Sequence, residues 1–169
     1  MIDETDRQIL DILQRDARTS NAEVARRVGM APSAVFERIR KLEERGVITG
    51  YTARLDPHAL GLGLLAFVFV RSDEKLGAPE TEARLAEIPE AQEVHHIAGE
   101  DCFLVKVRTP NTESLGRLLR ERFGAIPTLR STKTTIVLQT IKETLELPNV
   151  QRAESTDEEM EEAPEVLGG

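Results

Sequence analysis

The sequence predicts an α+β protein with a helical N-terminal domain, a second domain of the order β-α-β-β-α-β, and an acidic tail. Three observations support this fold class. Residues 20–46 have the apolar spacing of two short helices joined by a turn. A run of seven apolar residues at 64–70 begins a series of strand and helix patterns, and residues 143–169 contain nine acidic residues against one basic residue.

The first predicted helix follows Asp3, whose side chain is suited to capping a helix N-terminus. Ile9, Leu10 and Leu13 recur at helical spacing along it. This apolar side predicts a helix that packs behind the two helices that follow.

The next two helices carry start and stop signals. Ser20 and Glu23 have the spacing of a capping box, and Gly29 is suited to the left-handed conformation that ends a helix. Pro32 is favourable at the first position of the second helix, and Gly46 ends that helix. A short glycine-containing turn between two such helices is typical of a helix-turn-helix, whose second helix lies in the major groove of DNA.

The second helix of this pair has one apolar and one polar side. With Val35 at the centre of the buried side, a step of about 100° per residue places Ser33 and Glu37 on the exposed side. Arg38 lies on a flank, where a long basic side chain reaches a phosphate more easily than a base. The alternative is an ordinary surface helix in which Glu37 and Lys41 form an i, i+4 ion pair. The predicted DNA-binding residues are Ser20, Asn21, Ser33, Ala34, Glu37, Arg38, Arg40 and Lys41.

Residues 47–55 follow the helix pair and contain Gly50 in a predicted turn and the β-prone Tyr51 and Thr52, which indicate a short strand or wing. The predicted winged helix-turn-helix domain therefore spans residues 1–50, and residues 51–62 form a linker strand or hinge. A domain of this size buries little surface and is marginally stable alone. We therefore expect it to be supported by the second domain or by a partner chain.

The second domain is predicted to span residues 63–148. Its apolar run is far too short to cross a membrane, and its β-branched and aromatic residues indicate a buried strand. The predicted elements are a strand at 64–70, a helix at 79–88, strands at 91–97 and 102–108 around a turn at 99–101, a helix capped by Asn111, and a strand at 129–142. This order predicts a ferredoxin-like fold.

The charge of the chain is unevenly distributed. The net charge is −8, but residues 1–55 carry ten basic and nine acidic residues, and residues 56–142 carry eleven and twelve. The acidic excess therefore lies at the C-terminal end. A nearly neutral DNA-binding domain neutralises few phosphates, so tight binding needs two or more copies of the domain.

Four stretches between Asp3 and about Pro148 form a specific set: DETDRQILDILQRDAR, PSAVFERIRKLEERGVITGY, LDPHALG and IAGEDCFLVKV. Through them the sequence resembles the leucine-responsive and asparagine regulator (Lrp/AsnC) family. The resemblance implies a transcription regulator that binds double-stranded DNA and whose second domain binds an amino acid or a related metabolite. It also implies homodimers that assemble further, often to octamers.

Carried over to this sequence, the resemblance places Ser33 and Arg38 at the family's usual recognition-helix positions. Ala31 stands where the family typically has a serine N-cap, which weakens the start of that helix by about 1 kcal/mol. In the family's effector loop a glycine is followed three residues later by an aspartate. Here Gly99 matches, but Cys102 occupies the aspartate position.

The residues of this turn suit an amino-acid ligand by their own chemistry. A tight glycine turn exposes backbone N–H groups to a carboxylate, and Glu100 or Asp101 can pair with an ammonium group. The alternative is a simple hairpin turn with solvated acids, in which the strand threonines are ordinary strand formers. The predicted effector-binding residues are Ala98, Gly99, Glu100, Asp101, Cys102, Thr132 and Thr134, with the threonines supplied by a neighbouring subunit.

Neither a catalytic site, a cofactor nor a metal site is predicted. Cys102 is the only cysteine, and a buried thiol is favoured over a reactive one. His95 and His96 are adjacent and point to opposite faces of a strand, so they do not readily share a metal. The N-terminus has no basic and apolar signal, which predicts a cytoplasmic location. We therefore expect a regulator, not an enzyme.

Two other functions remain open at this point. Sirohaem decarboxylases have a similar two-domain layout, and in such an enzyme His95 or His96 would be the active-site candidate. The other possibility is a metabolite-binding oligomer whose helical domain does not bind DNA.

The tail, residues 149–169, is acidic and poor in aromatic residues, which predicts disorder. Its simplest role is to increase solubility. The alternative is that it competes with DNA phosphates for the basic helices.

Overall fold

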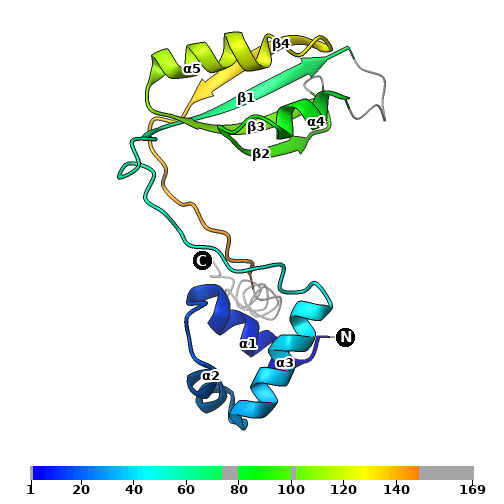
Figure 1. Ribbon diagram of the computed structural model, residues 1–169, viewed down its shortest axis with the longest axis vertical. Coiled ribbons are helices and arrows are strands. Elements are labelled where there is room, and N and C mark those ends of the chain that lie inside the picture. The colour runs from blue at the N-terminus through cyan, green and yellow to red at the C-terminus, as the bar shows by residue number, and fades with distance from the viewer. Residues whose placement is uncertain (1, 74–79, 100–101, 149–169) are drawn as a thin grey trace, which may run out of the picture. The chain divides into compact units, whose positions relative to one another are not determined.

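The computed structural model describes residues 2–73, 80–99 and 102–148. The chain divides into two compact units, one formed by residues up to Ala53 together with the chain from Glu143, and the other by Arg54–Lys142 (Figure 1). Residues 143–148 therefore group with the helical unit, whereas the sequence assigned them to the second domain. The predicted tail lies outside the described residues.

The helical unit contains α1 (Glu4–Arg15), α2 (Asn21–Val28) and α3 (Pro32–Glu44). These helices confirm the three predicted from the sequence. They enclose a small apolar core, to which α1 contributes Ile9, α2 contributes Val24 and α3 contributes Val35. All three of these side chains are fully buried. The unit therefore has one apolar side per helix, as the spacing predicts.

The helix caps differ partly from those predicted. Asp3 and Asp6 form a reciprocal capping box at α1. Ser20 accepts a hydrogen bond from the Glu23 N–H at 3.3 Å, but the Glu23 carboxylate binds arginines instead of completing a capping box. Gly29 ends α2 at φ +70°, which confirms the predicted left-handed conformation, and Ala31 precedes α3 without a side-chain cap.

The strand or wing predicted at residues 47–55 is not present in these described residues, which form no regular secondary structure. Tyr51 instead donates a hydrogen bond from its hydroxyl to the Glu43 carboxylate at 2.9 Å. Val47 and Ile48 turn back onto the end of α3 through backbone hydrogen bonds to the Leu42 carbonyl. A strand fails to form here because the described part of this unit contains no neighbouring strand with which it could pair.

The second unit is a single antiparallel sheet with helices on one face (Figure 1). The strands lie in the order β2-β3-β1-β4, and this order confirms the ferredoxin-like prediction. The elements are β1 (Leu64–Ser72), α4 (Glu80–Ala86), β2 (Ala91–His96), β3 (Phe103–Thr109), α5 (Thr112–Leu118), a π-helical turn (Leu119–Phe123) and β4 (Leu129–Ile136).

Alternation along the central strands separates the two faces of the sheet. Val68 and Val70 of β1 and Val105 of β3 are fully buried beneath the helices, where Leu85 of α4 and residues of α5 complete the core. The side chains between them on the strands, such as Phe67, face away from the helices. One face of the sheet is thus covered by the helices, and none of the described helices covers the other.

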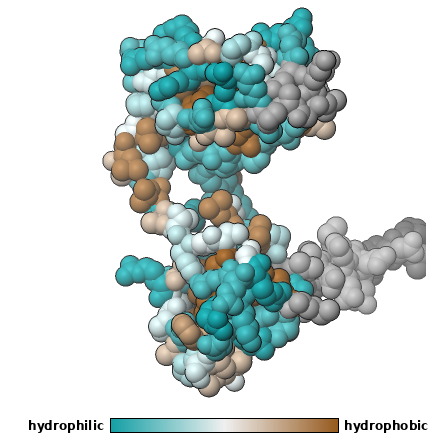
Figure 2. Space-filling model, turned by 45° about the vertical axis from the view of Figure 1, so that its right-hand side comes forward, coloured by the Kyte–Doolittle hydropathy of each residue, from teal (hydrophilic) through white to brown (hydrophobic). Residues whose placement is uncertain are grey.

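The last strand is shorter than the predicted 129–142. The final backbone hydrogen bond of β4 to β1 runs from the Val137 N–H to the Leu65 carbonyl at 2.9 Å. Further residues would need partners before Leu64, but that part of the chain turns at Gly61. Figure 2 shows patches of hydrophobic residues at the surface of the molecule. Leu60, Leu138 and Ile141, on the segments that flank the sheet, are exposed.

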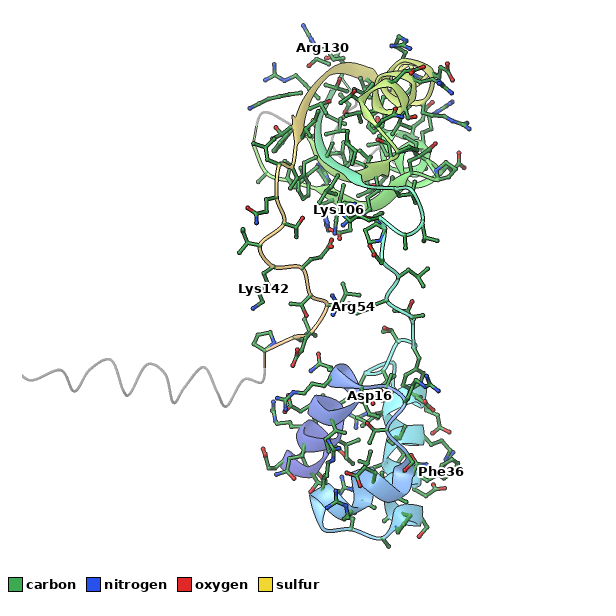
Figure 3. The ribbon with its side chains drawn as sticks, turned by 90° about the vertical axis from the view of Figure 1, so that its left-hand side faces the viewer. Asp16, Phe36, Arg54, Lys106, Arg130 and Lys142 are labelled. Carbon is green, nitrogen blue, oxygen red and sulfur yellow. The ribbon has the colours of Figure 1, made fainter. Side chains whose placement is uncertain are left out.

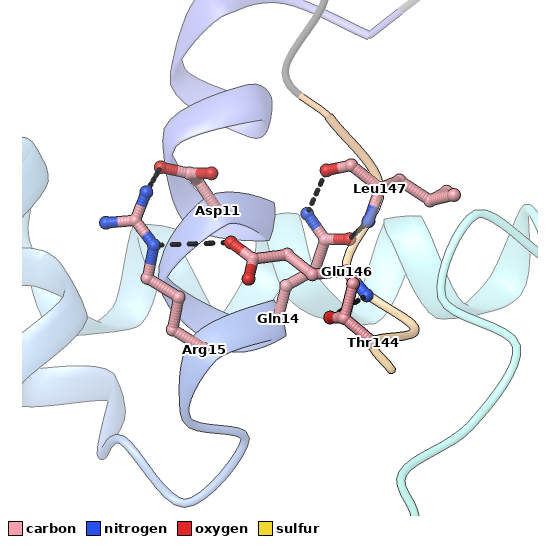
Figure 4. Close-up of polar contacts among 6 residues, drawn as sticks. All are labelled: Asp11, Gln14, Arg15, Thr144, Glu146 and Leu147. Carbon is pink, nitrogen blue, oxygen red and sulfur yellow. Dashed lines mark hydrogen bonds and ion pairs between the residues drawn. The ribbon is translucent and has the colours of Figure 1, made fainter. Parts of the chain in front are cut away.

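The C-terminal segment of the helical unit is held to α1 by hydrogen bonds from a side chain of α1 to the backbone of the segment (Figure 4). The side-chain amide of Gln14 donates to the Leu147 carbonyl at 3.3 Å and accepts from the Leu147 N–H at 2.7 Å. Arg15 lies 3.5 Å from the Glu146 carboxylate. Because Gln14 binds the backbone, the contact fixes the path of the segment while the Leu147 side chain is 72% exposed.

Replacing Gln14 with alanine removes both hydrogen bonds to Leu147. We expect the Leu147 amide to exchange with solvent about threefold to tenfold faster, because one modest hydrogen bond protects it. Gln8→Ala is the matched control. Gln8 lies on the same helix, and its side-chain amide donates a hydrogen bond to the Glu4 carboxylate and not to the C-terminal segment. Equal exchange rates at Leu147 in the two variants, measured by hydrogen–deuterium exchange, would contradict the contact.

Candidate DNA-binding and effector sites

The outer side of α3 carries an acid-flanked arginine. Arg40 is bound to Glu37 at 2.9 Å and also to Glu44, one turn further along. The two carboxylates raise the pKa of Arg40, with the Glu37 hydrogen bond as the largest cause. Lys41 is exposed, and it has no ion pair within the described part of the chain. The Glu37–Lys41 pair of the alternative interpretation is therefore absent from the described residues, and Glu37 binds Arg40.

Arg38 has a different environment from Arg40. Its guanidinium lies 2.7 Å from the Asp3 carboxylate and 2.7 Å from the Asp6 carboxylate, so it joins α3 to the start of α1. The hydrogen bond to Asp3, followed by that to Asp6, raises the pKa of Arg38. The pKa of Asp3 is lowered mainly by the Asp6 N–H and then by Arg38. This geometry indicates that Arg38 positions α3.

The basic residues of α2 are also paired. The Glu23 carboxylate binds Arg26 at 2.7 Å and Arg27 at 2.7 Å, and these two hydrogen bonds lower the pKa of Glu23 to about 2. Ser20 is exposed and Asn21 is half-buried at the start of this helix. The charges of both arginines are therefore partly compensated within the helix, although their remaining N–H donors are exposed.

Of the predicted residues on α3, Ser33 is exposed and Ala34 is half-buried. The sequence reasoning missed Phe36, which is 53% exposed and lies on the outer side of the helical unit (Figure 3). Its spacing three residues after Ser33 was the signal that could have identified it as an outer-face residue.

The predicted effector residues lie at one end of the sheet. Ala98 and Gly99 are exposed, and Gly99 has a φ of +131° that favours glycine. Glu100 and Asp101 lie outside the described residues. Cys102 is half-buried, and its N–H donates to the Val70 carbonyl at 2.8 Å.

The threonines reach the same end of the sheet from the other side. Thr132 pairs with Val70 and Thr134 with Val68, both across β1. The turn that ends at Cys102 and the residue Thr132 are therefore separated by β1, about 10 Å apart by two strand spacings. Within one chain they flank the same strand without touching.

The two adjacent histidines have separate surroundings. His95 lies 3.2 Å from the Glu93 carboxylate, which also binds Lys106 at 2.9 Å. His96 stacks on the Phe103 ring with a centroid distance of 4.9 Å. Across residues 2–73, 80–99 and 102–148, no three histidine, cysteine or acidic side chains are grouped as metal ligands. Among the described helices, none has the length and apolar character that a membrane span requires.

Comparison with known proteins identifies both units. Residues 2–49 match the family model of a winged helix-turn-helix DNA-binding domain, and residues 65–147 match that of the Lrp/AsnC ligand-binding domain. The chain belongs to the Lrp/AsnC family of transcriptional regulators. The first region contains the predicted DNA-binding residues and the second contains the predicted effector-binding residues.

Full-length relatives agree with this assignment. The chain is 45% identical to the HTH-type transcriptional regulator FL11 of Pyrococcus horikoshii, over 87% of this chain and 96% of that protein. It is 38% identical to the leucine-responsive regulatory protein of Salmonella typhimurium, over 84% of this chain and 88% of that protein. These relatives are transcriptional regulators, which supports a regulator and not the enzyme of sirohaem-decarboxylase type.

A solved structure is similar along nearly its whole length. The transcriptional regulator of Neisseria meningitidis in complex with L-Met has a TM-score of 0.84 and 27% identity, over 90% of this chain and 99% of that one. The fold of the Lrp/AsnC regulators and the fold described here are therefore the same.

Arg38→Ala tests the positioning role of this arginine. We expect it to lower the free energy of unfolding of the helical unit by about 1–2 kcal/mol, because the largely buried Asp6 carboxylate loses a charged partner. Arg40→Ala is the control and should cost about 0.5 kcal/mol or less, since its pairs are exposed. Equal losses in chemical denaturation followed by circular dichroism would rule out the positioning role.

Proposed function

We propose that this protein is a cytoplasmic, homo-oligomeric regulator whose binding to specific DNA sites responds to an amino acid. The observation that carries the proposal is the exposed outer side of α3 in a helix-turn-helix. Ser33, Ala34 and Glu37 lie in the N-terminal half of this helix, which a major groove would receive. Arg40 follows Glu37 by three residues on the same side of the helix. Lys41, together with Ser20 and Asn21 at the start of α2, is suited to phosphate contacts.

Arg38 enters this proposal in a different role. Its two carboxylate partners make it a positioning residue that fixes the angle of α3. To contact a phosphate, Arg38 would have to bind it beside Asp3 or in place of Asp3, which is the more exposed of its two carboxylate partners. In a dimer, two such helices would enter successive major grooves. The operator should therefore be roughly palindromic, with half-sites about one helical turn (roughly 34 Å) or a multiple of it apart.

An amino acid is the effector that best suits the second unit. The Neisseria relative is a complex with L-Met, and the matched domain model is a ligand-binding domain. Gly99 exposes backbone at the end of the sheet, where a carboxylate could bind N–H groups. Because β1 separates this turn from Thr132, we propose that the ligand is reached by threonine hydroxyls of a neighbouring subunit. These are the hydroxyls of Thr132 and of Thr134, which lies on the same strand.

The uncovered face of the sheet supports self-association. Phe67, Phe69 and Leu104 are half-buried on this face, and the Lys133 ammonium lies 5.5 Å from the centre of the Phe69 ring. A second copy could bury these apolar side chains and bring two helical units to one DNA site. We propose that such dimers assemble further, to octamers.

The DNA-binding part of the proposal is tested by fluorescence anisotropy. The full chain is titrated against DNA from the upstream region of its own gene and against scrambled DNA, with and without L-methionine and a pool of amino acids. We expect tighter binding to the native fragment and a shift with the effector. We also expect binding to weaken only modestly as salt increases, because few phosphates are neutralised per copy and few counterions are released. Equal weak binding to both fragments would contradict a regulator of its own gene.

The effector coupling has a reciprocal consequence. Whatever factor the effector imposes on operator affinity, the operator must impose on effector affinity. Isothermal titration of the effector in the presence and absence of operator measures this factor, and identical affinities would exclude coupling between the sites.

The oligomer is tested by a charge placed on the uncovered sheet face. Phe67 pairs in register with Lys106, so Phe67→Lys places two positive charges side by side where a second copy would bind. We expect sedimentation equilibrium to show a change from oligomer to monomer. Glu113→Lys on the exposed side of α5 is the control and should leave the association unchanged, because it lies on the helical side of the unit. Association that survives Phe67→Lys would place the interface elsewhere.

A further inference from the structure

We propose that Phe36 contacts the 5-methyl group of a thymine in the major groove and thereby contributes to sequence specificity. The inference rests on the proposed entry of α3 into DNA and adds a base contact to it. No other part of the function described above requires an exposed aromatic ring at this position.

Phe36 differs from the other phenylalanines of the chain. All five lie in the described part of the chain. Phe36 is 53% exposed, whereas the other four are buried or half-buried. Its neighbour Val35 is fully buried in the helical core, to which Phe36 does not belong. The ring therefore projects from the unit (Figure 3) without stabilising its core.

The position of Phe36 along α3 is suited to reading bases. It is the fifth residue of the helix, within the N-terminal half that contacts base edges in helix-turn-helix proteins. Ser33, Phe36, Glu37 and Arg40 are spaced i, i+3, i+4 and i+7 and so form one stripe on the helix. A groove that receives Ser33 and Glu37 thus also receives Phe36.

The chemistry of this stripe favours an apolar contact. The guanidinium of Arg40 is already bound by Glu37 and Glu44, so the side chains around Phe36 carry little uncompensated positive charge. Thymine is the one base that presents a methyl group in the major groove, and phenylalanine is among the side chains that contact it. Burial of the ring against that methyl group removes apolar surface from water without requiring an ion pair to break.

The experiment uses the full chain and DNA sites selected with it from a random library. Each thymine of the selected site is replaced in turn by deoxyuridine, which removes only the methyl group. At one thymine in each half-site we expect the wild-type affinity to fall about threefold to tenfold, which is at the lower end of the discrimination that a bidentate base contact supplies. Phe36→Ala should bind the thymine and deoxyuridine sites equally, and Phe36→Leu should retain part of the difference.

Two controls separate this contact from other effects. Leu60→Ala removes a comparably exposed apolar side chain in the other unit and should leave the thymine preference unchanged. Lys41→Ala should weaken binding to both sites alike and reduce its salt dependence, as expected of a phosphate contact.

The outcomes distinguish the inference from the function on which it rests. If the wild-type chain selects no sequence, the proposed function fails and the inference with it. If it selects a sequence but Phe36→Ala keeps the same preference for thymine over deoxyuridine, the inference alone is overturned. Loss of self-association in Phe36→Ala, with the thymine preference intact, would likewise overturn it and identify a second copy as the partner of the ring.

Discussion

The position of α3 depends on burying one side of the helix against α1 and α2. Val35 and Ile39 supply the apolar contact, and Arg38 adds a polar one beside it, with Asp6 almost enclosed and Asp3 more exposed. Apolar burial alone is non-directional and would tolerate rotation of the helix. The paired carboxylates restrict that rotation, because a guanidinium binds oxygens only in certain directions. The same side of α3 therefore always faces outward, and the DNA contacts proposed for that side depend on this orientation.

Charge compensation governs what this unit can offer to DNA. Glu23 holds the arginines of α2, and Glu37 with Glu44 holds Arg40. These carboxylates compensate the charge of the arginines, so each copy attracts phosphates less strongly than its number of arginines suggests. Modest affinity per copy favours assembly of several copies on one site, and it leaves a larger share of the discrimination to neutral contacts in the groove.

The helical unit is built from both ends of the described chain. After β4 ends at Ile136, the chain returns to α1, where Gln14 binds the backbone of Leu147. The helical unit is thus connected to the sheet unit through two chain segments, one after α3 and one after β4. Strand β4 carries Thr132 and Thr134 and leads directly into this contact. The strand that carries the two threonines is therefore linked to α1 by the chain up to Leu147 and by the hydrogen bonds of Gln14, without passing through α3.

The sequence by itself determined the three N-terminal helices, the strand order of the second unit and the family. Helical spacing, Gly29, Pro32 and the alternation of Val68 and Val70 are local signals that survive without tertiary context. The tertiary structure decided which charges pair. Arg38 is predicted to lie at DNA, and in the folded chain it reaches Asp3 and Asp6. Glu23 binds Arg26 and Arg27, which are only three and four residues away, so this pairing is a local alternative to its cap. The tertiary structure also decided the end of β4, the absence of a strand at residues 47–55 and the contact between Gln14 and Leu147. Apart from the Glu23 pairs, each of these depends on a partner distant in sequence or on the lack of one, and spacing along the chain does not encode which side chains or strands meet in space.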